Sequence, residues 1–251
     1  MPPLPVFATL AAGILGTSFL SGIFGMAGGM LLMGLLLAVM PVAAAMALHG
    51  ITQMTSNGWR AIVWRAHVRW RIVACFAAGS IVAAGAFAAF AAPPTKGIAL
   101  LILGLTPFIG FALPLRLRLN VVRSAHGVVC GAVCMTLQMI AGVSGPILDV
   151  FFVQSGLDRR GIVATKAAVQ TLGHALKVAY FGSLLVDGGD HLSPWLVAMA
   201  IVLAILGTQS SRRVLERLSD AQFRNWSGRL IFVLSIAYLG QGAWLTANGS
   251  L

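Results

Sequence analysis

Long apolar runs, separated by short breaks, constrain the fold of this chain more than any other feature. A helix needs about 20 apolar residues to cross the hydrocarbon core of a bilayer. Runs that suit one crossing each cover residues 42–64, 71–92, 97–114, 161–185, 194–210 and 229–247. Only 9% of the 251 residues are charged, which leaves too few polar side chains to cover a soluble domain. The sequence therefore predicts an all-α polytopic membrane protein.

Two further apolar stretches, residues 6–40 and 124–156, are too long for one crossing and too short for two. A glycine cluster interrupts each of them near its middle, GMAGG at 25–29 and GVSGP at 142–146. Non-helical backbone at membrane depth is tolerated only where it is buried in protein or lines a cavity. We therefore expect each stretch to form a hairpin of two short helices whose break lies beside a cavity.

Basic side chains are concentrated in four of the breaks between the runs. These groups are Arg60, Arg65, Arg69 and Arg71; Arg116, Arg118 and Arg123; Arg159 and Arg160; and Arg212, Arg213, Arg217, Arg224 and Arg229. If both broken stretches return to the side from which they enter, all four groups lie on one face, which the positive-inside rule makes cytoplasmic. Both termini are then outside. This topology explains the net charge of +11 by contact with a lipid bilayer, without nucleic-acid binding.

The two halves of the chain, residues 1–118 and 119–251, repeat the same order of elements. With a shift of 117 residues, Gly28 falls on Gly145 and Gln53 on Gln170, and each half is a broken hairpin followed by three spans. Three crossings are an odd number, so we expect the halves to have opposite orientations. Inverted-topology repeats are a common plan of secondary transporters, whose substrate site lies near the bilayer midplane between the repeats.

Polar side chains recur at helical spacing in the span that follows each hairpin. They are His49, Gln53, Asn57 and Arg60 in the first half, and Lys166, Gln170, His174 and Lys177 in the second. Each set lies on one face of its helix, and ionisable groups inside a bilayer usually face the bundle interior or a water-filled cavity. Arg60 and Lys177 could instead extend from the ends of their spans towards the headgroups.

These residue types favour an anion as the bound substrate. A helix that begins after a glycine break offers free backbone N–H groups to an anion. The residues expected to bind it are Gly28, Gly29, His49, Gln53, Asn57, Ser144, Gly145, Lys166, Gln170 and His174, with Lys166 balancing its charge. Asp149, the only acid in either hairpin, would pair with Lys166; alternatively, Asp149 or a histidine would carry a proton, and these roles are left open. The glycines alternatively serve only close helix packing.

Enzyme motifs are absent from the sequence. It contains no G-x-S-x-G, H-E-x-x-H, C-x-x-C or P-loop pattern, so we expect no catalytic residues, no metal site and no cofactor. The longest polar loop, about residues 211–228, is too short for a nucleotide-binding domain.

The segment GIFGMAGGMLLMGLLL, followed by a span and then by WRAHVRWR, resembles the first repeat of the TauE/SafE family of membrane transporters. AGVSGPIL, followed by GIVATKAAVQTLGHALKVAYFG, resembles the second repeat. The resemblance implies export of sulfite or a related organosulfonate across the bacterial inner membrane, without a bound cofactor. The chain departs from the family pattern at Met26-Ala27, where members are often richer in glycine, and at Pro146, which ends the second break.

Two other functions are compatible with the sequence. One is a channel-like facilitator of another small solute, in which the glycine breaks form a filter. The other is a membrane assembly factor that transports nothing and turns its polar stripes towards a protein partner. Formation of a homodimer, and whether transport is coupled to protons or driven by the membrane potential alone, are also left open.

Overall fold

The computed structural model describes residues 4–24, 26–112, 119–215 and 220–249, and their regular structure is entirely helical. The α-helices are α1 (Leu4–Phe24), α2 (Met26–Val39), α3 (Val42–Val63), α4 (Trp70–Phe90), α5 (Lys96–Ala112), α6 (Ser124–Ala141), α7 (Gly145–Phe152), α8 (Arg159–Asp187), α9 (Pro194–Leu215) and α10 (Asp220–Ala247). A short 3-10 helix, η1 (Arg65–His67), follows α3. The prediction of an all-α fold is confirmed.

Five of these helices are long and apolar enough to cross a membrane. The segments are Pro5–Ile23, Trp70–Phe90, Ser124–Ala141, Pro194–Ser211 and Gly228–Ala247. α3 and α8 have 22 and 29 residues, which is also sufficient length, but their polar stripes lower their hydropathy. α2 and α5 are shorter apolar helices. The chain is therefore a multi-pass membrane protein.

The two broken stretches do not consist of two short helices each, as expected from the sequence. In each of them the first helix is long enough to cross, with 21 residues in α1 and 18 in α6, and only the second is short, with 14 residues in α2 and 8 in α7. α6 ends at Gly142, whose φ of 77° is left-handed and favours glycine. The expectation was wrong for α1 and α6 because the glycine cluster follows a full-length helix.

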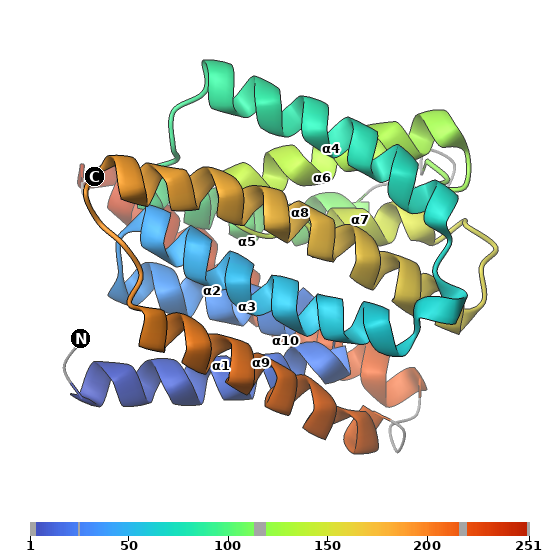
Figure 1. The fold of residues 1–251 in the computed structure, drawn as a ribbon, viewed down its shortest axis with the longest axis horizontal. Coiled ribbons are helices and arrows are strands. Elements are labelled where there is room, and N and C mark those ends of the chain that lie inside the picture. Colours follow the sequence, from blue (N-terminus) through green and yellow to red (C-terminus); the bar gives the residue numbers. More distant parts are fainter. Residues whose placement is uncertain (1–3, 25, 113–118, 216–219, 250–251) are drawn as a thin grey trace.

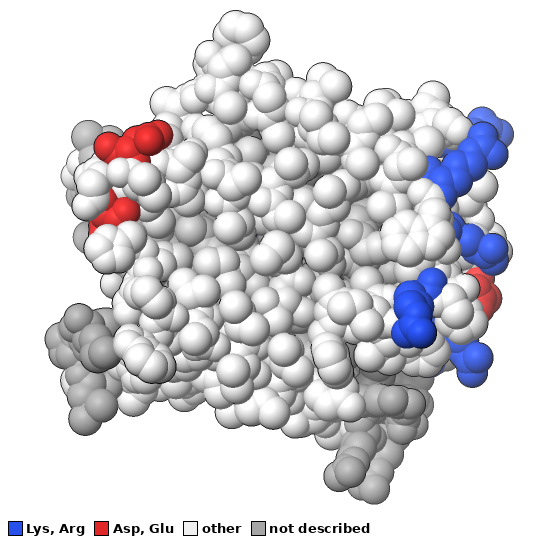
Figure 2. Space-filling view, viewed as in Figure 1, with Lys and Arg blue, Asp and Glu red and all other residues white. Residues whose placement is uncertain are grey.

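Charge separates the two ends of the helix bundle. Both termini lie at one end, and the connections from α3 to α4 and from α7 to α8 lie at the other (Figure 1). Lysine and arginine side chains gather at that second end, whereas acidic side chains are prominent at the first (Figure 2). The arrangement agrees with the topology expected from the arginine-rich breaks. Arg116, Arg118 and Arg217 lie outside the described residues.

α3 and α8 pack against each other along their length near the middle of the bundle (Figure 1). Small residues allow this close approach: a Cβ atom built on Gly50 would lie 2.6 Å from Val178 Cγ2, and one on Gly58 would lie 3.6 Å from Thr171 Cγ2. The two pairs also show that the helices are antiparallel. The polar stripes of α3 and α8 are thereby brought together inside the protein.

Candidate functional site

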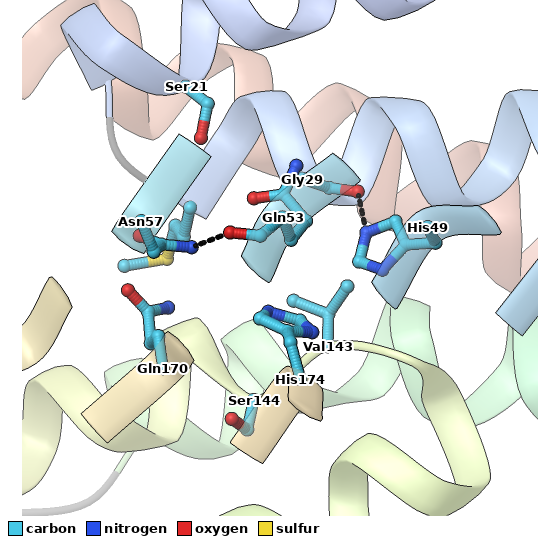
Figure 3. A pocket seen from close by; sticks show the side chains of 10 residues that line it. Ser21, Gly29, His49, Gln53, Asn57, Val143, Ser144, Gln170 and His174 are labelled. Atoms are coloured by element: carbon cyan, nitrogen blue, oxygen red, sulfur yellow. Dashed lines mark hydrogen bonds between the residues drawn. The ribbon is translucent and has the colours of Figure 1, made fainter. Parts of the chain in front are cut away.

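A small cavity lies where the polar stripes of α3 and α8 meet the two glycine breaks. Its lining residues are Ser21, Met26, Gly29, His49, Gln53, Asn57, Val143, Ser144, Gln170 and His174. Gln170 and His174 extend from α8 towards Gln53 and Asn57 of α3 (Figure 3). The cavity is tight, with unfilled space for about one water molecule. From the two stripes, His49, Gln53, Asn57, Gln170 and His174 line the cavity, whereas Arg60, Lys166 and Lys177 do not.

The starts of the two short helices meet at this cavity. Met26 and Gly29 belong to the first turn of α2, and Val143 and Ser144 directly precede α7. A Cβ atom built on Gly145 would lie only 2.6 Å from Met26 Cβ, so the two helix starts are nearly in contact. Helix N-termini carry partial positive charge and backbone N–H groups without intrahelical partners. Two of them here add to the positive potential of one cavity.

A buried lysine lies directly behind the cavity wall. Lys177 Nζ donates hydrogen bonds to His49 Nδ1 at 2.8 Å and to the Gly142 carbonyl oxygen at 2.9 Å, and the lysine is 0% exposed. His49 Nε2 lies 3.0 Å from the Gly29 carbonyl oxygen, which can only accept, so this nitrogen carries the proton and Nδ1 accepts. Lys177 therefore does not extend towards the headgroups from a span end.

Arg60 lies at the other end of the α3 stripe. Its Nη2 donates a hydrogen bond of 3.1 Å to the carbonyl oxygen of Ser21, which itself lines the cavity. The side chain is partly buried, so it is held against the cavity wall rather than directed at the lipid surface. Two basic side chains, Arg60 and Lys177, therefore flank the cavity along the α3–α8 pair.

The cavity is rich in hydrogen-bond donors and contains no carboxylate among its lining residues. Gln53 Nε2 and His174 Nδ1 are buried without a hydrogen-bond partner in the described part of the chain. Unpaired buried polar groups are rare and costly in folded proteins, so each calls for an explanation, of which a bound water or ion is one. An amide donor with no partner, two helix starts and two flanking basic side chains suit an anion.

The comparisons with known proteins identify the family. The sequence model described as sulfite exporter TauE/SafE matches residues 9–238. The chain belongs to the TauE/SafE family. TauE/SafE proteins are membrane transporters and not enzymes, and membership implies a small anion as substrate. No curated protein and no solved structure is significantly similar to the chain.

Lys166 has a different place in this TauE/SafE protein from the one expected. Its ammonium group forms an ion pair with the carboxylate of Asp149, and it does not line the cavity. The two side chains are 25% and 34% exposed. The structure thus favours pairing with Lys166 as the role of Asp149. Lys177, which lies at the depth of the Gly142 break, is the lysine next to the cavity.

Gly28 and Gly145 also lie outside the cavity lining. A Cβ atom on Gly28 would lie 2.3 Å from both the Thr17 carbonyl oxygen and the Ser21 backbone nitrogen, so this glycine allows α2 to pack on α1. For these two positions the packing alternative describes the structure. Sequence reasoning missed Ser21, Met26 and Val143 as lining residues, since apolar or isolated side chains give no signal of their own.

Replacing Lys166 by methionine is expected to leave the affinity for the transported anion within about threefold of the wild-type value. The Lys166–Asp149 pair is partly exposed and lies away from the cavity, and such pairs contribute at most about 1 kcal/mol. Anion titration of the purified variant by calorimetry measures the affinity. A tenfold or greater loss of anion affinity would show that Lys166 belongs to the substrate site.

Proposed function

We propose that this TauE/SafE transporter exports a small sulfur-containing oxyanion, sulfite or an organosulfonate, across the bacterial inner membrane. The observation that carries the proposal is the unpartnered Gln53 amide donor in a cavity without a carboxylate among its described lining residues. The anion would receive hydrogen bonds from Gln53, Asn57, Gln170 and His174, and from backbone N–H groups of the helix starts beside Gly29 and Ser144. A planar or pyramidal oxyanion presents several acceptor oxygens and can use donors from both sides of the cavity.

The helix packing supports an inverted repeat as the framework of this transporter. In the proposed halves, residues 1–118 and 119–251, α1 corresponds to α6, α2 to α7, α3 to α8, α4 to α9 and α5 to α10. α4 packs extensively on α6, as α1 does on α9, and α3 and α5 pack on their own counterparts α8 and α10. Exchange of the halves thus turns the α4–α6 contact into the α9–α1 contact and leaves the α3–α8 and α5–α10 contacts as they are, which is the pattern of a two-fold axis between the halves.

The tightness of the cavity favours a carrier over a channel. The side chains of His49, His174 and Lys177 are buried and close the cavity on the side away from the arginine-rich loops. An oxyanion with three oxygens needs more room than about one water molecule, so the helices that line the cavity must separate to admit it. Binding that requires such a change, alternately from either side, is the mode of action of secondary transporters.

Thermal stabilisation across a panel of anions tests the proposal. The detergent-purified protein is heated with sulfite, sulfate, thiosulfate or sulfoacetate, and with sodium chloride at the same ionic strength as a control. A ligand that binds only the folded state at 100 times its Kd stabilises that state by about 2.7 kcal/mol. We expect at least one sulfur oxyanion to raise the Tm well above the chloride control. Equal Tm values in all salts would contradict the proposal.

Flux into proteoliposomes separates a carrier from a channel-like facilitator. A carrier gives saturable uptake of labelled anion, and uptake is accelerated by unlabelled anion on the opposite side. A channel gives a flux that grows with concentration and shows no such exchange. Absence of both binding and flux would favour an assembly factor.

A further inference from the structure

The hydrogen bonds of Lys177 match a neutral amine better than an ammonium group. A lysine ammonium has three N–H donors and an amine has two. The structure offers Lys177 two acceptors, His49 Nδ1 and the Gly142 carbonyl oxygen, both within 3 Å. A third acceptor is not found among the described residues, and the side chain has no contact with solvent. An ammonium group here would bury one donor without a partner.

The charge of an ammonium group at Lys177 would also lack a counter-charge. The acidic residues whose side chains the structure describes are engaged or distant: Asp149 pairs with Lys166, Asp158 caps the start of α8, and Asp187 and Asp190 are exposed at and after the end of α8, ten or more residues beyond Lys177. An uncompensated charge buried in a membrane protein is expensive. Lys177 is therefore poised to be neutral until a negative charge arrives.

The elements that pack most on α8 are α3, α4, α6 and η1. α3 contributes His49, and α8 itself contributes His174 one turn before the lysine. Residues 79–90 of α4 and residues 135–145 around the Gly142 break contain no ionisable side chain. η1, with Arg65 and His67, packs near the start of α8, more than two turns from Lys177. Tyr180, three residues after the lysine on α8, packs its ring on Phe87 of α4. The two histidines are the titratable groups that these described elements place between Lys177 and the cavity.

Both histidines connect Lys177 to the cavity. Their rings are 5.5 Å apart, both line the cavity, and His174 Nδ1 is buried without a partner in the described chain. An anion in the cavity would therefore lie against His49 and His174, with Lys177 directly behind them. It would supply the negative charge that an ammonium group at this position lacks.

We infer that Lys177 binds one proton when the anion enters the cavity and releases it when the anion leaves, so that anion and proton cross together. This inference rests on the proposed function and deepens it. The amine nitrogen gains the proton from water through the opened cavity and returns it to water on the other side. A monovalent anion and its proton then cross together with no net charge. The membrane potential therefore acts on the transport only when the anion carries more than one negative charge. By reciprocity, the anion binds more tightly where protons are abundant.

Calorimetric titration with methanesulfonate and with sulfate tests the coupling, since neither anion takes up a proton near neutral pH. Each titration is run at the same pH in Tris and in bicine, whose heats of protonation differ, and the difference in binding heat gives the protons taken up. Sulfonate buffers are excluded because they are candidate ligands. We expect about one proton per bound anion in the wild type, and a Kd that rises roughly tenfold per pH unit in alkaline solution.

Variants of Lys177 assign the proton to this residue. Lys177→Arg keeps a permanent positive charge, so it should bind the anion with no proton uptake and no dependence of Kd on pH. Lys177→Met should bind at least tenfold more weakly and also take up no proton. Lys166→Met, the matched control on the same helix, should take up one proton like the wild type.

The outcomes separate the two proposals. Anion binding by the wild type without proton uptake would overturn the coupling and leave the proposed function intact. Unchanged uptake in Lys177→Arg would overturn it as well, because another group would then carry the proton. If neither Lys177 variant folds, the wild-type titration still decides. No binding of either anion by a wild type that is also not stabilised by the wider anion panel would overturn both proposals.

Discussion

Replacement of Gln53 by glutamate is expected to lower the affinity for the transported anion by about 100-fold or more. The exchange keeps the size of the side chain but removes the unpartnered Nε2 donor and places a carboxylate in the cavity wall. Two negative charges about 4 Å apart repel by about 4 kcal/mol at an effective dielectric constant of 20. Each 1.4 kcal/mol corresponds to a factor of about ten in affinity. Titration with sulfite, followed by flux into proteoliposomes, measures the loss.

Gln209→Glu is the matched control for this experiment. Gln209 is exposed on α9, where its Oε1 accepts a hydrogen bond of 3.0 Å from Trp59 Nε1, and a glutamate can accept the same bond. The Gln209→Glu variant should bind the anion with the same affinity as the wild type. Gln53→Met, which removes the donor without adding charge, should weaken binding by roughly tenfold, the cost of one lost hydrogen bond to a charged ligand. Wild-type affinity in a folded Gln53→Glu protein would place the substrate elsewhere.

Gly131→Leu is expected to cause a large loss of stability. α4 and α6 cross so closely that a Cβ atom on Gly131 would lie 2.0 Å from the Phe76 carbonyl oxygen. On the facing helix, a Cβ atom on Gly79 would lie 1.9 Å from the Val128 carbonyl oxygen. Backbone cannot move aside as a flexible side chain does, so the two helices must separate. We expect a cost of about 3 kcal/mol or more, which corresponds to a fall of roughly 10 °C in Tm for a chain of this size.

Gly85→Leu, on the facing helix α4, provides the control. No described atom lies within 4 Å of a Cβ atom built on Gly85, so the added side chain has room and the Tm should change by only a few degrees. Thermal unfolding of the detergent-purified variants, followed by the loss of the monodisperse peak in size-exclusion chromatography, compares the two. Similar Tm values for Gly131→Leu and Gly85→Leu would show that the α4–α6 crossing is not tightly packed.

Much of the architecture follows from periodicity and composition, because both indicate whether a helix face contacts lipid or the protein interior. Apolar runs of about 20 residues identify spans, since any unpaired backbone group in lipid is costly. The stripes of α3 and α8 were recognisable because polar groups at helical spacing must share one face. Their meeting in a cavity followed from the cost of exposing such a face to lipid.

The helix lengths within the broken stretches depended on more than the glycines. Gly142 ends α6 after a full-length helix, and Met26 begins a short α2 that packs back on α1 through Gly28. A glycine permits a break at several neighbouring positions, and the contacts between helices select one of them. The sequence therefore indicated that a break exists, but the packing decided its depth.

The sequence by itself determined that this chain is a helical membrane protein with two broken stretches and two polar stripes, because hydropathy and spacing act within each segment. Only the tertiary structure decided which lysine reaches the cavity. Lys166 and Lys177 lie on nearly the same face of α8, about 16 Å apart along its axis. The choice between them rests on where the end of α6 meets α8, a contact between residues distant in the chain. Through that contact Lys177 donates a hydrogen bond to the Gly142 carbonyl oxygen, whereas Lys166 forms its ion pair with Asp149.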